Sequence, residues 1–166
     1  MLGGSGGARA INEAVLGLAP VLLEAFPEWE VLHQAGPAEF ARLAERPRHA
    51  RHTLVPFIAR VDEAMAAASL VLSRSGASTC AELKAAGRGS VLVPLPTSAN
   101  DHQRQNAQAM VAEGRARLVE QGEGFTVQLE EALRGLLNCA SERQLLSKAP
   151  EINRSVAQCL DDLEGL

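Results

Sequence analysis

The segment from Ser73 to Glu82 has the residue types that most clearly indicate chemistry. It follows an apolar run, residues 70–72, that predicts a buried strand, and it leads into residues that favour a helix. A tight turn of small residues at that junction exposes backbone N–H groups beside the positive end of the helix dipole, where a phosphate binds well. Because Glu82 lies one turn into the predicted helix, its carboxylate can reach hydroxyl groups next to that phosphate. The segment therefore indicates a nucleotide or sugar-nucleotide site.

A glycine-rich turn at residues 3–7 is a second candidate for phosphate binding. Ser5 is the only side chain there with obvious chemistry, and Gly4 and Gly6 flank it. The turn is not a P-loop, because no Lys-Ser/Thr pair follows it. It does not complete a GxGxxG pattern either, because Arg9 stands at the place of the final glycine. A flexible linker explains the turn about as well as a diphosphate site does.

A third candidate is the polar segment 94–106, which follows another predicted strand and contains His102, Gln103 and Asn106. Amide and imidazole groups donate and accept hydrogen bonds, as the hydroxyl groups of a sugar require. Both this segment and the segment 73–82 can also be explained without a ligand. Each is then an ordinary helix start, capped by Ser78 in the first case and by an Asn or Asp in the second.

Composition limits the class of protein. The length of 166 residues fits one domain over 1–166, and 46% hydrophobic with 22% charged residues argues against disorder. A net charge of −4 argues against nucleic-acid binding, which normally needs a basic face. Cys80, Cys139 and Cys159 lack the spacing of a metal site and predict buried thiols in a reducing compartment. No apolar run is long enough to cross a bilayer, and no secretory leader is recognisable.

Strands and helices are predicted to alternate along the chain. Apolar runs predict strands over 29–34, 53–57, 70–73, 90–94 and 116–119. Helical periodicity predicts helices over 8–25, 38–45, 61–68, 78–86 and 102–113, and a helical tail over 126–166 with breaks near Cys139 and Pro150. Strands that are apolar on both faces and alternate with helices indicate an α/β fold, a Rossmann-like parallel sheet with helices on both faces.

The start of the sequence departs from this plan. A glycine-rich turn of this kind normally follows a strand, but only Met1 and Leu2 precede it here. In a doubly wound sheet that first strand is central. We therefore expect either a truncated first strand or a chain cut from something longer. We also expect the loss of the strand to leave the sheet less stable or prone to associate.

Together these segments resemble the carboxyl-terminal half of the MurG family, N-acetylglucosaminyltransferases that convert lipid I to lipid II in peptidoglycan synthesis. The matching segments, in the order and spacing of the family, are residues 3–12, 55–58, 73–79 with Glu82, 91–94, and 101–103 with 106–107. The resemblance implies a GT-B fold, of which this chain would be the half that binds the donor, UDP-N-acetylglucosamine. It implies no cofactor and no metal, because oriented backbone donors stabilise the departing UDP.

The resemblance also implies which residues contact the donor. The backbone of Ile58, after Phe57, contacts the uracil edge, and Glu82 accepts hydrogen bonds from the ribose. The residues implied around the diphosphate are Gly4, Ser5, Gly6, Ala77, Ser78 and Thr79, and Arg74 is a further implied donor-binding residue. Gln103, with His102 beside it, is implied to bind the N-acetylglucosamine hydroxyls, and Asn106 is a further implied donor-binding residue.

The amino-terminal half of the family has no counterpart in this sequence. By the resemblance, that half holds the catalytic base, binds lipid I and meets the membrane, so that the full-length enzyme is peripheral on the cytoplasmic face of the bacterial inner membrane. We therefore expect this chain alone to bind the donor weakly and to turn over little. Two alternatives stay open: a soluble donor-binding subunit of a split two-chain glycosyltransferase, and a non-catalytic nucleotide-binding module.

Overall fold

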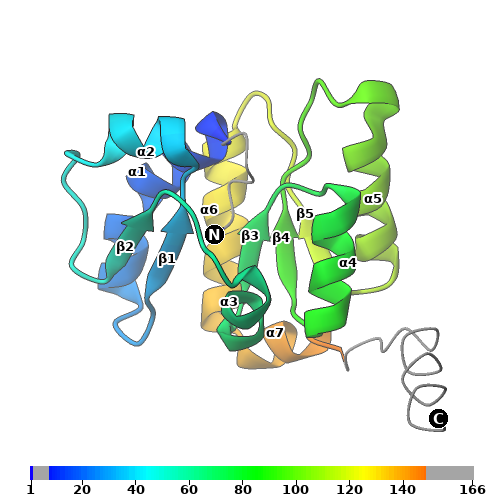
Figure 1. Ribbon diagram of the computed structural model, residues 1–166. Helices are drawn as coiled ribbons and strands as arrows, with labels where there is room; N and C mark the ends of the chain where they lie inside the picture. Colours follow the sequence, from blue (N-terminus) through cyan, green and yellow to red (C-terminus); the bar gives the residue numbers. More distant parts are fainter. Residues whose placement is uncertain (2–7, 149–166) are drawn as a thin grey trace, which may run out of the picture.

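A computed structural model describes residue 1 and residues 8–148, and within that part of the chain helices and strands alternate (Figure 1). The strands are β1 (Val31–Gln34), β2 (His52–Val55), β3 (Val71–Ser73), β4 (Ser90–Leu92) and β5 (Ala116–Leu118). The α-helices are α1 (Arg9–Ala25), α2 (Pro37–Leu43), α3 (Val61–Ala67), α4 (Ala77–Ala86), α5 (His102–Ala112), α6 (Phe125–Asn138) and α7 (Ala140–Leu146), and a 3-10 turn, η1 (Ala99–Asp101), precedes α5.

The predicted alternation of elements is confirmed, and most strand ends are shifted by one or two residues. Helix α4 begins at Ala77 with Gly76 as its N-cap, so the alternative in which Ser78 caps the helix is wrong. The predicted break near Cys139 is confirmed, because this residue adopts an extended backbone between α6 and α7. The predicted break near Pro150 lies outside the described residues.

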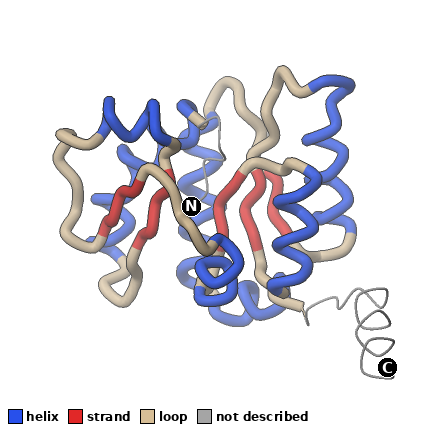
Figure 2. The backbone as a smooth tube through the Cα atoms, in the orientation of Figure 1, coloured by secondary structure: helices blue, strands red, loops and turns tan. Residues whose placement is uncertain are grey.

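The strands form two parallel blocks (Figure 2). One block pairs β1 with β2, with Val31 opposite His52. The other has the order β3-β4-β5, with Ser90 opposite both Val71 and Ala116. Reading across both blocks gives β2-β1, a gap, and then β3-β4-β5. This is the doubly wound order with its central strand position empty of any described strand.

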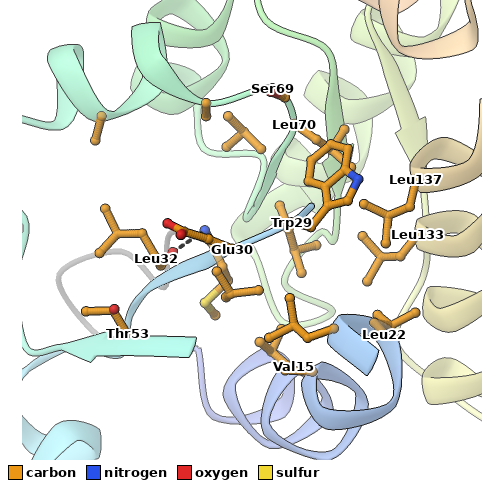
Figure 3. A pocket seen from close by; sticks show the side chains of 18 of the residues that line it. Val15, Leu22, Trp29, Glu30, Leu32, Thr53, Ser69, Leu70, Leu133 and Leu137 are labelled. Atoms are coloured by element: carbon orange, nitrogen blue, oxygen red, sulfur yellow. Dashed lines mark hydrogen bonds between the residues drawn. The ribbon is translucent and has the colours of Figure 1, made fainter. Parts of the chain in front are cut away.

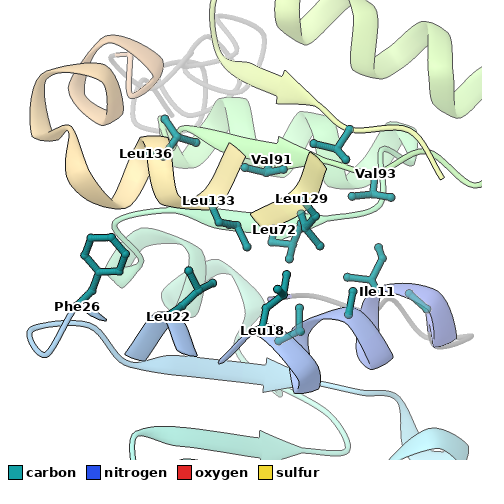
Figure 4. Close-up of a cluster of buried hydrophobic side chains, with 14 residues drawn as sticks. Ile11, Leu18, Leu22, Phe26, Leu72, Val91, Val93, Leu129, Leu133 and Leu136 are labelled. Carbon is teal, nitrogen blue, oxygen red and sulfur yellow. The ribbon is translucent and has the colours of Figure 1, made fainter. Parts of the chain in front are cut away.

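Helices cover both faces of the sheet, as the two-sided apolar character of β3 and β4 predicts. On one face α1 and α6 pack together against the sheet, where Ile11, Leu22 and Leu129 are buried among others (Figure 4). On the other face α3, α4 and α5 bury Met65, Leu83 and related side chains against the same strands. The fold class predicted from the sequence, a parallel α/β sheet between helical layers, is confirmed.

All three cysteines are predicted to be buried thiols, and the structure confirms this for one of them. Cys80 is buried, and burial raises the pKa of its thiol. Cys139 is half-exposed because it stands at the break between two helices, so its prediction as a buried thiol is wrong. Cys159 lies outside the described residues.

A polar chain is buried beside α1. Asn12 donates through Nδ2 to the carbonyl of Ala35 at 3.0 Å, and its Oδ1 lies 3.1 Å from Nε2 of His33. Nδ1 of His33 lies 3.1 Å from Nε2 of His52. Since an amide oxygen only accepts, Nε2 of His33 donates to Asn12. When both imidazoles are neutral, Nδ1 of His33 then accepts from Nε2 of His52. Nδ1 of His52 has no hydrogen-bond partner among the described residues.

The burial of this polar chain disfavours protonation of His33 and His52. Burial, and secondarily the neighbouring His52, lowers the pKa of His33 from 6.5 to about 3. Burial together with nearby Arg48 lowers the pKa of His52 from 6.5 to about 4. Both histidines therefore stay neutral in the folded chain at pH values where the unfolded chain binds protons.

We expect the free energy of unfolding to fall as the pH drops below 6.5, by up to about 1.4 kcal/mol per pH unit for each histidine, because the unfolded state then binds more protons. Urea titrations between pH 7.5 and 5 measure this slope above the range of the carboxylates. His52→Gln should flatten the slope, whereas His102→Gln, at an exposed position, should keep it. Stability that stays constant over this range in the unaltered chain would contradict the expectation.

Candidate functional site

The loops that follow the strands lie along one edge of the sheet. All the strand pairs are parallel, so the carboxyl ends of β1 to β5 point the same way, toward the upper edge in Figure 1. Ligands of open α/β sheets bind outside this edge, next to the position where the strand order reverses. In this chain that position is the boundary between β1 and β3. The candidate segments after β2, β3 and β4 all lie along this edge, as predicted.

The N-terminus of α4 presents backbone donors at this edge. The first amides of a helix have no partner within the helix, and here the cap residue is Gly76, without a side-chain cap hydrogen bond. Ala77 and Ser78 are exposed and Thr79 is half-buried. This ten-residue helix can therefore direct uncapped N–H groups and its positive end at an anion. Contact between this turn and a diphosphate stays a prediction.

Glu82 lies on the next turn of α4, and its side chain is exposed. Residues three and four apart share a face of a helix, so the carboxylate follows the same face as Ser78 and Thr79. That placement suits a carboxylate that accepts hydrogen bonds from hydroxyl groups beside a bound phosphate. Its role at the ribose stays a prediction.

The loop after β2 presents one apolar ring and one bonded amide. Phe57 is 61% exposed. The backbone N–H of Ile58 donates to Oε1 of Gln34 at 2.9 Å, and Gln34 itself is buried at the end of β1. The predicted contact of Ile58 with a base edge would therefore use its carbonyl, or its N–H after exchange with Gln34.

Arg74 joins three loops at the edge. Its guanidinium donates to the carbonyls of Val93 at 3.1 Å and Pro94 at 2.9 Å, and also to Oε1 of Gln121. Burial lowers the pKa of this guanidinium, which nevertheless remains charged. The side chain therefore positions the loops that follow β3, β4 and β5. Direct contact of Arg74 with the donor stays a prediction.

Gln103 and Asn106 are brought together with the β3–α4 loop. Oε1 of Gln103 accepts from the N–H of Leu95 at 3.0 Å, which leaves its Nε2 group as a donor for a ligand. Asn106 donates through Nδ2 to the carbonyl of Ser75 at 3.0 Å. Ser75 in turn donates to the carbonyl of Gln103 at 2.7 Å. Asn106 therefore helps to position the loops of the candidate site through its bond to Ser75. His102 is exposed at the start of α5.

The backbone before α5 is strained. Asn100 and Asp101 have φ angles of 48° and 57°, in the left-handed region that asparagine and aspartate tolerate better than most residues. Asp101 occupies the N-cap position of α5, but its side chain makes no cap hydrogen bond. The alternative in which an Asn or Asp side chain caps this helix is therefore wrong. Two consecutive left-handed residues cost free energy, and such strain concentrates in ligand-binding segments.

The predicted site residues Gly4, Ser5 and Gly6 lie outside the described residues. Sequence reasoning missed Gln34, Ser75 and Gln121, all of which support the site through hydrogen bonds. Ser75 lies within the segment 73–82. Gln34 and Gln121 lie 24 and 47 residues from their partners, and no local pattern announces such contacts. Within the described part of the chain, no three His, Cys, Asp or Glu side chains are grouped to hold a metal ion.

Comparison with known proteins identifies the family. The model of the glycosyltransferase family 28 C-terminal domain matches residues 1–162. The chain is 40% identical over 167 residues to the UDP-N-acetylglucosamine--N-acetylmuramyl-(pentapeptide) pyrophosphoryl-undecaprenol N-acetylglucosamine transferase of Xylella fastidiosa strain M12, covering 98% of this chain and 46% of that protein. It is 43% identical over 141 residues to the enzyme of the same name from Nitratidesulfovibrio vulgaris strain DP4, covering 83% of this chain and 38% of that protein.

Solved structures agree with this assignment. The crystal structure of Acinetobacter baumannii MurG matches with a TM-score of 0.70 and 33% identity, over 88% of this chain and 41% of that one. A glycotransferase of kitacinnamycin matches in fold, with a TM-score of 0.59 and 18% identity over 82% of this chain and 33% of that one. The chain thus spans less than half the length of these relatives. The resemblance to the carboxyl-terminal half of MurG is confirmed, and the chain belongs to the family of glycosyltransferase family 28 C-terminal domains.

Proposed function

We propose that this chain binds UDP-N-acetylglucosamine as the donor-binding half of an inverting N-acetylglucosaminyltransferase. The observation that carries the proposal is the uncapped N-terminus of α4 at the carboxyl edge of the sheet, with Glu82 on the next turn. Gln103, whose Nε2 group remains a donor, lies across the same edge at the start of α5. The names of the relatives, which act with UDP-N-acetylglucosamine, support the choice of donor.

The arrangement suits transfer in which UDP leaves. When an acceptor hydroxyl attacks the anomeric carbon, negative charge grows on the departing diphosphate. Fixed N–H donors stabilise that charge without a metal. One helix N-terminus contributes about 1 kcal/mol, or about 2 when partly buried, so the loops must act together. Arg74 meets that need by holding the loops after β3, β4 and β5 in one arrangement.

The remainder of the reaction is assigned to a second domain. We propose that the catalytic base and the lipid I site belong to an amino-terminal half like that of the longer relatives, and that the whole enzyme works at the cytoplasmic face of the membrane. Among the described residues, no helix combines the length and apolar character needed to cross a bilayer. Residues 1–166 form one donor domain in this proposal, and α6 and α7 are the last helices of its described part.

Replacing Glu82 by Ala should weaken UDP and UDP-N-acetylglucosamine equally, by about 1–3 kcal/mol, because both ligands carry the ribose whose hydrogen bonds to a charged group are lost. Isothermal titration calorimetry measures both affinities. Glu131→Ala, at an exposed position on α6, is the matched control and should change neither. An unchanged affinity for UDP in Glu82→Ala would exclude this carboxylate from the ribose site.

Replacing Gln103 by Ala or by Glu should weaken UDP-N-acetylglucosamine more than UDP, because both substitutions remove the Nε2 donor proposed to contact the sugar. Gln103→Glu keeps an oxygen for the N–H of Leu95, so it separates sugar contact from loop support. The measured quantity is the ratio of the two dissociation constants, by the same calorimetry. Equal losses for both ligands in both variants would remove Gln103 from the sugar site.

Replacing Arg74 by Met should lower the free energy of unfolding by about 2 kcal/mol, because charged hydrogen bonds to two carbonyls and to Gln121 are lost. The affinity for UDP should fall as well, because the loops lose their common support. Urea denaturation and calorimetry report the two effects. Arg134→Met, which removes only the surface pair with Glu130, should change both by less than about 0.5 kcal/mol. Full stability of Arg74→Met would show that the loops do not depend on this side chain.

A further inference from the structure

The carboxamide of Gln34 lies at the carboxyl end of β1, next to the loop that follows β2. This loop crosses the end of β1 on its way to α3 (Figure 1), and the N–H of Ile58 donates to Oε1 of Gln34 at 2.9 Å. Gln34 itself is only 4% exposed. A buried amide group therefore stands at the edge where open α/β sheets bind their ligands.

The loop that carries Ile58 also borders a cavity inside the sheet layer. The cavity has a volume of about 830 Å³, and Leu32, Leu70 and Ile58 are among its lining residues (Figure 3). Because Glu30 and Leu70 directly precede β1 and β3, the cavity extends toward the amino ends of these strands, away from the candidate site. A base that belongs to a nucleotide at the carboxyl edge therefore meets the loop from outside this cavity.

One end of the Gln34 carboxamide is engaged, and the other end is available. Oε1 accepts from Ile58, whereas Nε2 has no hydrogen-bond partner among the described residues. Nor is Nε2 one of the fully enclosed polar atoms that lack a partner, so it stays open to solvent or to a ligand. Since both atoms are bonded to the same carbon, the bond to Ile58 also fixes the direction of the Nε2 donor.

The carbonyl of Ile58 supplies an acceptor next to this donor. Within the described part of the chain, no group donates a hydrogen bond to it. The carbonyl belongs to the residue that bonds Gln34, so the donor and the acceptor meet at one junction between β1 and the loop. Phe57 precedes this junction, and its exposed ring offers an apolar surface to a planar ligand group.

The backbone that carries the carboxamide is anchored on two sides. The N–H of Ala35 donates to the carbonyl of Val55 at 3.0 Å, and the carbonyl of Ala35 accepts from Nδ2 of Asn12 at 3.0 Å. These bonds tie the residue after Gln34 to β2 and to α1. A donor that is already oriented in this way loses little freedom when a ligand binds.

Gln34 should keep its bond to Ile58 when a nucleotide binds. If a base took over the N–H of Ile58, Oε1 of the buried Gln34 side chain would lose its partner. Leaving a buried acceptor unpaired costs more free energy than one exchanged hydrogen bond contributes. The groups left for a base are therefore the Nε2 donor of Gln34 and the carbonyl of Ile58.

We propose that Gln34 is a specificity-determining residue whose Nε2 group donates to the O4 carbonyl of uracil, while the carbonyl of Ile58 accepts from N3–H. This role rests on the proposed function, because a uridine nucleotide must first bind at this edge. Uracil has the acceptor O4 beside the donor N3–H, and it matches this pair. Cytosine has an amino donor in place of O4 and an acceptor at N3, so both contacts would be repulsive.

Two variants, Gln34→Glu and Gln34→Met, separate the two ends of the carboxamide. The first keeps an acceptor for Ile58 and replaces the donor by an acceptor, whereas the second removes both. Calorimetric titration with UDP and CDP at about pH 8, where the introduced carboxyl group is ionised, measures the ratio of the Kd for CDP to the Kd for UDP. This ratio should fall by ~10-fold or more in Gln34→Glu, because UDP loses a hydrogen bond and the amino group of CDP gains one. It should also fall, by less, in Gln34→Met.

The matched control is Gln128→Glu, which makes the same change of charge at an exposed position of α6 and should leave the ratio unchanged. A second measurement needs no nucleotide. Amide exchange at Ile58 should become ~10-fold or more faster in Gln34→Met and stay slow in Gln34→Glu, because only the first of these variants loses the acceptor. Melting curves of both variants show that each is folded.

An unchanged ratio in both variants would remove Gln34 from the base site, while binding of UDP to the unaltered chain would leave the proposed function in place. Tighter binding of UDP to Gln34→Met would also overturn the proposal, because the carboxamide would then compete with the base for the N–H of Ile58. Equal affinity of the unaltered chain for UDP and CDP would show that this pair of groups does not distinguish the bases. Failure of the unaltered chain to bind UDP would reject the proposed function, and this role of Gln34 with it.

Discussion

Parallel pairing between strands buried on both faces is the constraint on which the rest of this structure depends. β3 and β4 are fully buried, so their backbone groups must be satisfied within the ladder rather than by water. Parallel neighbours require a crossover, and α4 and α5 supply it on one face while α1 and α6 cover the other. Every strand then ends at the same edge. The loops at that edge are the part of the molecule free to vary in composition, and they carry the polar side chains that suit a nucleotide sugar.

At that edge, polar groups divide into those that bond inward and those that remain available. Hydrogen bonds to neighbouring backbone groups engage the side chains of Arg74, Asn106 and Gln34. These bonds fix the loops relative to one another. The amides at the start of α4 and the carboxylate of Glu82 face outward. This division is what a preorganised anion site requires, because donors that are already oriented need not reorganise when charge develops.

The block of β1 and β2 contains a buried polar chain whose last member has no partner among the described residues. His33 and His52 are buried and neutral in a chain that ends at an unpartnered Nδ1 among the described residues. On the other edge of β1, Met1 contributes a single residue of pairing beside a large apolar cavity. The Met1 pairing lies next to the reversal point of the sheet, where the doubly wound plan puts its ligand, whereas the unpartnered Nδ1 lies on the outer strand β2.

The sequence by itself determined the order of helices and strands, the parallel sheet between helical layers and the loops that carry the candidate site, because apolar periodicity and small-residue turns are local signals. It also placed Ser73–Glu82 and the 94–106 segment at one edge, since parallel strands leave no other choice. Only the tertiary structure decided which polar atoms face outward. Arg74 meets Gln121, Ile58 meets Gln34 and Asn106 meets Ser75 across separations of 24 to 47 residues, and such pairings follow from packing geometry that no local pattern encodes.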